Sequence, residues 1–250
     1  MNYSPFEYRV LPIFGFYFVL IIFGIIVSFK LIKKYKERNQ DAALHLAIVF
    51  AIFTAAIGIL AIGLAEAAIT GYYKEIYRFS LPLAYSLVVL ANIFLYYFAS
   101  NITDRAKNAF LPLVICGVVL IIILFLPWNW WGYPREEYAG KLNIRLYTNI
   151  AFISFAYLIY ITIAILCQQT RKRAEDKIAH LGLTLLLYSM ISMILFYVMV
   201  LFDNIMIVFF NHSGYSEFQF AAWIFALIFV ILAYLSLVMP EWLIKRIKEK

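Results

Sequence analysis

The feature that most constrains the fold of this chain is a series of seven long apolar stretches. A helix needs about 20 residues to cross a lipid bilayer. The stretches cover residues 10–32, 42–69, 78–99, 109–127, 146–168, 178–202 and 218–239. Their apolar residues are continuous and do not alternate, which favours helices over the strands of a barrel. Because 65% of the 250 residues are hydrophobic and only 14% are charged, the sequence predicts one all-α domain, a polytopic bundle of seven transmembrane helices.

The basic residues predict how these helices are oriented. Of 21 Lys and Arg residues, those predicted to lie on the side of the N-terminus are Arg9, Lys74, Arg78, Arg135, Lys141 and Arg145. All others fall near the loops after the first, third and fifth stretch or at the C-terminus. Because basic residues accumulate on the cytoplasmic side, we expect the N-terminus outside and the C-terminus inside, in a multi-pass protein of the cell membrane. The short basic tracts adjoin helix ends, which favours contact with anionic lipid heads over nucleic acid.

The pattern R-x-x-D-x-x-x-H-L occurs twice, at residues 38–46 and at residues 173–181. One interpretation is an internal repeat of 3+1+3 type, in which two three-helix units flank a linker helix. The other is a signal for the start of a helix, with basic residues on the cytoplasmic side, an Asp that caps the helix and a His at the lipid headgroups. The pattern fits a helix start better, because the histidines and the acids that follow them do not share a face in both halves; an internal repeat stays possible.

Two carboxylates interrupt apolar stretches at nearly matching positions of the two halves, Glu66 and Asp203. At 100° per residue, Glu66 lies at the edge of a face of small residues that starts at Ala51. Asp203 continues a polar stripe of Gly182, Ser189 and Ser192. Small residues mark close helix approach in lipid, and polar ones avoid it, so both acids should face the bundle interior.

An ionised carboxylate within a membrane is costly, so it is usually paired, protonated or functional. Glu66 and Asp203, with Asn92 and Asn204, are therefore the candidate ligand or proton site. Asn149 and several tyrosines, Tyr85, Tyr96, Tyr157, Tyr160, Tyr188 and Tyr197, could line the same cavity. The structural alternative is that the acids lie at the outer interface, paired with Lys74, Arg78 or Arg145.

Two further segments carry aromatic residues typical of membrane interfaces. Trp128, Trp130 and Trp131 lie between the fourth and fifth stretches. They fit an interfacial anchor or a lid over an outward-facing pocket. Residues 240–250 form a short basic tail. Its amphipathic pattern directs Trp242 towards lipid tails, and Lys245 and Arg246 towards lipid phosphates.

The segment Leu237-Val-Met-Pro240-Glu-Trp242-Leu-Ile-Lys-Arg246 resembles the end of the last helix in prokaryotic, especially archaeal, seven-helix sensor modules. The resemblance implies a sensor whose last helix carries a signal to the cytoplasm. The chain departs from those modules by stopping where a kinase or regulator would begin. A signal would then pass to a separate cytoplasmic or membrane protein, and a homo-oligomer is also open.

Several classes are disfavoured. Residues 218–239 contain no Lys for a retinal Schiff base, so no retinal or other cofactor is expected. Cys116 and Cys167 lie in apolar runs and give no metal site. Catalytic residues are not expected, because the histidines at 45 and 180 lie far from the acids along their helices. Three hypotheses remain: a sensor or receptor-like module with an outward-facing cavity, a small-solute or proton-coupled carrier, and a non-catalytic accessory subunit. Against the carrier, the sequence lacks the Pro-Gln signature of small 3+1+3 sugar transporters.

Overall fold

The computed structural model describes residues 3–39, 41–103, 107–126, 129, 144–210, 212 and 214–248. Its α-helices are α1 (Leu11–Arg38), α2 (Asp41–Thr70), α3 (Glu75–Thr103), α4 (Phe110–Leu124), α5 (Ile144–Arg171), α6 (Lys177–Phe209), α7 (Glu217–Val238) and α8 (Glu241–Lys248). Short 3-10 turns, η1 (Tyr8–Val10) and η2 (Lys107–Ala109), precede α1 and α4. The seven long helices are long and apolar enough to cross a membrane. The predicted class, an all-α polytopic bundle, is confirmed.

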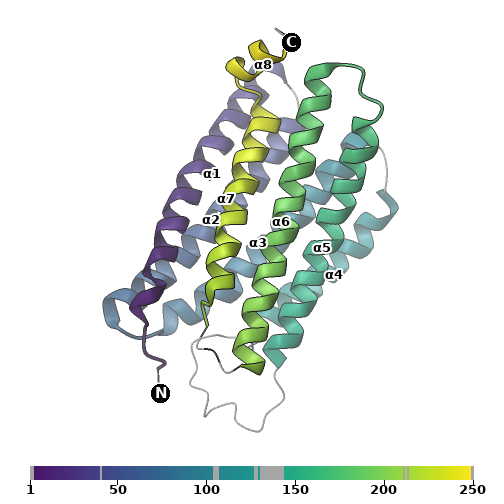
Figure 1. Ribbon diagram of the computed structural model, residues 1–250. Helices are drawn as coiled ribbons and strands as arrows, with labels where there is room; N and C mark the ends of the chain where they lie inside the picture. The colour runs from purple at the N-terminus through teal and green to yellow at the C-terminus, as the bar shows by residue number, and fades with distance from the viewer. Residues whose placement is uncertain are drawn as a thin grey trace.

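The long helices lie side by side, with the two chain ends at opposite ends of the bundle (Figure 1). We call the end with the N-terminus the N-face and the opposite end, with α8, the C-face. Helix α2 packs against α1 and α3, and α6 packs against α5 and α7, while α1 meets α7 and α3 meets α5. These six helices close a ring. Helix α4 packs against α3 and α5 and contributes nothing to the ring's interior.

Local signals explain where several helices begin and end. Asp176 caps α6, because its Oδ2 accepts a hydrogen bond from the backbone N of Ala179 at 3.0 Å. This cap is what the second R-x-x-D pattern predicts for a helix start. Helix α1 continues through a charged segment beyond the predicted limit at residue 32, because Lys and Arg are good helix formers. It ends at Asn39, whose left-handed backbone terminates the helix.

Helices α6 and α7 are joined along their length by polar contacts. Three serine hydroxyls donate hydrogen bonds across this interface: Ser189 to Phe229 O at 3.1 Å, Ser192 to Phe225 O at 2.8 Å, and Ser236 to Gly182 O at 2.8 Å. Gly182, Ser189, Ser192 and Asp203 are all buried, which confirms the inward orientation predicted for this stripe. Each hydrogen bond between membrane helices contributes roughly 0.6 kcal/mol. Because three of them are spread along this interface, α6 and α7 form one packed pair.

The small-residue face of α2 was expected to face the bundle interior, but it does not. Ala51 and Ala55 are exposed, and a Cβ added at Gly58 would meet nothing within 4 Å. The close approach occurs instead at Gly63, where an added Cβ would lie 2.1 Å from the hydroxyl of Ser80 on α3. The expectation was wrong because other faces of α2 are buried, including Ala47, Phe50, Phe53 and Ala56.

Helix α8 follows α7 at the C-face (Figure 1). Met239, with φ of 49°, ends α7 just before Pro240. The Lys34 ammonium of α1 donates a hydrogen bond to Leu237 O at 2.8 Å, in the last turn of α7. On α8, Trp242 is 58% exposed, and Lys245 and Arg246 are exposed as well. The contacts of these three side chains with lipid stay a prediction.

Candidate functional site

A cavity of about 830 Å³ lies inside the six-helix ring and is lined by α1, α2, α3, α5, α6 and α7. Its lining includes Ser4 and Gly214 at the N-face. On α6 the lining extends from Val208 to Met193, which is about 22 Å along the helix axis. No residue from the C-face ends of these helices contributes, so among the described residues the cavity ends blind. Its volume is typical of small-molecule sites.

The lining changes from polar to apolar with distance from the N-face. Polar side chains gather in the half near the N-face: Glu7, Tyr73, Tyr77, Asn149, Asp203, Asn204, His212, Tyr215 and Gln219. The inner half is mostly apolar, with Leu20, Phe50, Phe53, Ile57, Met193, Phe229 and Val230. Thr54 and Tyr197 are polar exceptions there, but the Thr54 hydroxyl is bonded to its own helix at 2.7 Å. The cavity thus suits a molecule that is itself polar at one end.

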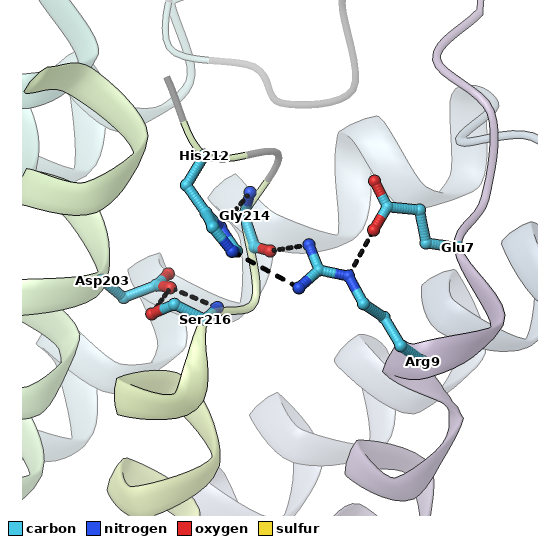
Figure 2. Close-up of polar contacts among 6 residues, drawn as sticks. All are labelled: Glu7, Arg9, Asp203, His212, Gly214 and Ser216. Carbon is cyan, nitrogen blue, oxygen red and sulfur yellow. Dashed lines mark hydrogen bonds and ion pairs between the residues drawn. The ribbon is translucent and has the colours of Figure 1, made fainter. Parts of the chain in front are cut away.

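Asp203 is the buried acid of the polar half. Its side chain is 6% exposed. Its Oδ1 accepts two hydrogen bonds from Ser216, from the backbone N at 2.7 Å and from Oγ at 2.6 Å (Figure 2). Ser216 precedes the first turn of α7, so Asp203 ties the end of α6 to the start of α7. Within the described part of the chain, nothing donates a hydrogen bond to Asp203 Oδ2, and no Lys or Arg forms a salt bridge with it.

A second polar cluster lies at the edge of the cavity. Arg9 forms an ion pair with Glu7, and its Nη2 donates a hydrogen bond to Gly214 O at 3.0 Å (Figure 2). His212 Nδ1 accepts from Gly214 N at 3.2 Å. Arg9 Nη1 also lies 3.4 Å from His212 Nε2, so the guanidinium, the imidazole and Gly214 form one cluster (Figure 2). The Arg9 charge is thus balanced by Glu7.

The structure separates the four predicted site residues into two groups. Asp203 and Asn204 line the cavity, and Asn204 Oδ1 accepts from Asn149 Nδ2 at 2.8 Å. Glu66 and Asn92 do not line it. Asn92 is fully buried and accepts from the Tyr160 hydroxyl at 2.8 Å, which links α3 to α5. Its Nδ2 has no hydrogen-bond partner among the described residues.

Glu66 has the same structural role as Asp203 but does not line the cavity. It is half-buried, and its Oε2 accepts from the backbone N of Tyr77 in the first turn of α3 at 2.9 Å. Each acid therefore lies near the end of one helix and is bonded to the start of the next, in α2–α3 and in α6–α7. The alternative pairing of Glu66 with Arg78 is not found among the described residues; Arg78 lies 3.6 Å from Glu75 and over the Tyr3 ring.

Three tyrosines of the polar half were not predicted. Tyr73 and Tyr77 have ring centroids 4.4 Å apart, and the Tyr77 and Tyr215 hydroxyls are 2.7 Å apart. Burial raises the pKa of Tyr73 and of Tyr215 well above the usual value, so both are neutral phenols at physiological pH. The chain has 19 tyrosines, so no sequence signal distinguishes these three.

Of the other residues expected to line a cavity, Tyr85, Asn149 and Tyr197 do so. Tyr188 is instead 54% exposed on α6. The three tryptophans of the predicted lid, Trp128, Trp130 and Trp131, lie outside the described residues. The lid therefore stays a prediction.

The fold and the cavity define a multi-pass membrane protein with a ligand-sized space inside a ring of six helices. In comparisons with protein-family models, with curated proteins and with solved structures, nothing matches this chain. Its function must therefore be argued from its own residues.

Proposed function

We propose that this protein is a sensor or receptor module of the cell membrane that binds a small ligand in the cavity. The observation that carries the proposal is a cavity that reaches the N-face and, among the residues that the structure describes, ends blind within the bundle. The distribution of basic residues favours an N-face outside the cell. A ligand would then enter from outside and remain on that side, as a receptor requires and a carrier does not.

Binding can be transmitted to the C-face by the paired helices α6 and α7. Both line the cavity, and the serine hydrogen bonds make them move together. Helix α7 leads through Met239 into α8, and Lys34 holds its last turn against α1. A ligand that displaces α6 and α7 from α1 would disturb this contact and reposition α8, where a cytoplasmic or membrane partner can detect the change.

A carrier is the second candidate, because Glu66 and Asp203 are bonded to the starts of corresponding helices of the two halves. That correspondence favours an internal repeat, with α1–α3 and α5–α7 as two units that rock about a central site. A carrier must also open the same cavity to the C-face. Access to cavity residues from each side therefore separates the two functions.

A bulky side chain placed in the cavity tests the sensor proposal without a known ligand. Ala226 of α7 lines the cavity, so Ala226→Phe occupies space that a ligand would fill. Spin labels attached after Lys36→Cys on α1 and Lys177→Cys on α6 report the separation of two exposed sites near the C-face. We expect Ala226→Phe to shift the distribution of distances between the labels.

The matched control adds the same ring to the lipid-facing surface. Val118 of α4 is 49% exposed and does not line the cavity, so Val118→Phe should leave the distances unchanged. Cys116 and Cys167 are replaced in every variant, so that only the introduced cysteines carry labels. If Ala226→Phe, like Val118→Phe, leaves the label distances unchanged, filling the cavity does not change the conformation at the C-face and the proposal fails.

A further inference from the structure

The half of the cavity near the N-face combines a carboxylate oxygen that accepts no hydrogen bond from the described residues with several aromatic rings. Asp203 Oδ2 accepts no hydrogen bond from the described residues, although the side chain lines the cavity. The rings of Tyr73, Tyr77 and Tyr215 line the same half. A carboxylate beside aromatic rings is the arrangement by which proteins bind ammonium groups, because the ring faces and the carboxylate both attract positive charge.

The charges at the cavity edge disfavour an anionic head. The positive charge of Arg9 is balanced by Glu7, and Arg9 itself does not line the cavity. A carboxylate or phosphate next to Asp203 would meet a like charge, and the two basic side chains nearby are already engaged, Arg9 with Glu7 and His212 with Gly214 N. A neutral hydroxyl can donate one hydrogen bond to Oδ2, but it leaves the charge of Asp203 uncompensated in an apolar surrounding.

The inner half of the cavity fits an unbranched apolar chain. Below Asp203, the lining of α6 continues for ten residues to Met193, which is about 15 Å. The side chains around it include Phe50, Phe53 and Phe229. Polar groups on the inner part of a ligand would lose their water and find few partners there, because Thr54 is bonded to its own helix and most other side chains of this half are apolar.

We infer that the ligand is a single-chain amphiphile whose protonated amine lies at Asp203 and whose alkyl chain extends towards Phe50. This inference rests on the proposed function, because it names the chemistry of the same cavity. The ammonium provides the donors that Asp203 Oδ2 lacks, in the half of the cavity that Tyr73, Tyr77 and Tyr215 also line. The head is thereby held near the N-face, and the chain separates the α6–α7 pair from α1 and α2.

The test compares three probes with the same alkyl chain and different heads: dodecylamine, dodecan-1-ol and dodecanoate. Binding of radiolabelled dodecylamine is measured to the full chain in phosphatidylcholine nanodiscs, with empty nanodiscs as the background. We expect saturable binding of dodecylamine that unlabelled dodecylamine displaces and dodecanoate does not. Ala226→Phe, which fills the inner half, should abolish it.

Two carboxylate variants decide the position of the head. Asp203→Asn keeps an acceptor for Ser216 but removes the charge, and we expect roughly ten- to a hundredfold weaker dodecylamine binding. Glu66→Gln removes the same charge from a residue that is also bonded to the start of the next helix but does not line the cavity, so it should bind as tightly as the natural protein. If Asp203→Asn does not fold, the selectivity of the natural protein among the three probes still decides.

The outcomes separate this inference from the function on which it rests. Equal binding of dodecanoate or dodecan-1-ol, or an unaffected Asp203→Asn, overturns the amine assignment and leaves the receptor standing. If no probe binds saturably while Ala226→Phe still shifts the C-face distances, the ligand class is wrong and the receptor again stands. If no probe binds and Ala226→Phe is silent, both proposals fall.

Discussion

Replacing Asp203 tests how the end of α6 is held to the start of α7. Asp203→Ala and Asp203→Asn both remove the negative charge, so the cost of burying that charge cancels between them. Only Asp203→Asn keeps an oxygen that can accept from Ser216. In Asp203→Ala the N–H and O–H of Ser216, which is 0% exposed, lose the acceptor that they contact at 2.7 and 2.6 Å.

The expected magnitude follows from these two hydrogen bonds. Leaving a buried donor without a partner costs about 1–3 kcal/mol, and the hydroxyl can rotate towards another acceptor while the backbone N–H cannot. Asp203→Ala should therefore be less stable than Asp203→Asn by about 1–3 kcal/mol. The same pair of changes at the half-buried Glu66, which accepts a single hydrogen bond, should differ by at most about 1 kcal/mol.

The assay is reversible unfolding in mixed micelles with increasing mole fraction of sodium dodecyl sulfate, followed by circular dichroism. The transition midpoints should rank Asp203→Asn above Asp203→Ala, with a smaller gap between Glu66→Gln and Glu66→Ala. Equal midpoints for the two Asp203 variants would refute the reasoning, because the acceptor at this position would then contribute nothing.

Three further changes test separate parts of the structure. Gly63→Ala should lower the free energy of unfolding by about 1–3 kcal/mol through overpacking against α3. Gly58→Ala, where an added Cβ meets nothing within 4 Å, should not destabilise α2; an equal loss in both would contradict the packing. Tyr160→Phe removes the hydrogen bond between α3 and α5 and should cost roughly 0.6 kcal/mol, up to about 1.7, in the same unfolding assay. Burial raises the pKa of Tyr215, so the contribution of its neutral phenol to the free energy of unfolding is full below the ordinary tyrosine pKa of about 10 and is lost as the pH rises above it. Tyr215→Phe should therefore flatten the alkaline part of the plot of stability against pH, and an unchanged plot would contradict the assignment.

The seven spans could be predicted because each apolar stretch is long, and in lipid such a stretch satisfies its backbone hydrogen bonds by forming a helix. The ends were less accurate. Helix α1 continues to Arg38 and α6 to Phe209, beyond the limits predicted from hydrophobicity. Helix formation depends on backbone hydrogen bonds and on caps such as Asp176, which apolar content does not report.

The candidate site was predicted in part. Asp203 was located because three small or polar residues on α6 share its face, and that face is buried against α7. Glu66 was placed by the same argument with small residues alone, and that argument failed on α2. Whether an acid is bonded to the start of the next helix or lines a cavity depends on the path of the connecting loop, which a helical wheel does not contain.

The aromatic side of the site could not have been predicted. Tyr73 lies just before α3 and Tyr77 in its first turn, and Tyr215 lies in the α6–α7 connection, 138 residues after Tyr77. Their proximity depends on how the ring of helices closes, and each is one of 19 tyrosines. Asp203 and Asn204 had a distinctive context because polar residues are rare in an apolar stretch.

The most direct test of the central claim, a ligand cavity reached only from the N-face, is thiol labelling in oriented membrane vesicles. A membrane-impermeant maleimide is applied to one side at a time, in a background without Cys116 and Cys167. Ala226→Cys reports the cavity, Lys177→Cys reports the C-face, and Met190→Cys reports a buried position outside the cavity. The account predicts that Ala226→Cys reacts from the N-face side only, Lys177→Cys from the opposite side only, and Met190→Cys from neither. Reaction of Ala226→Cys from the side that labels Lys177→Cys, or from neither side, would contradict it.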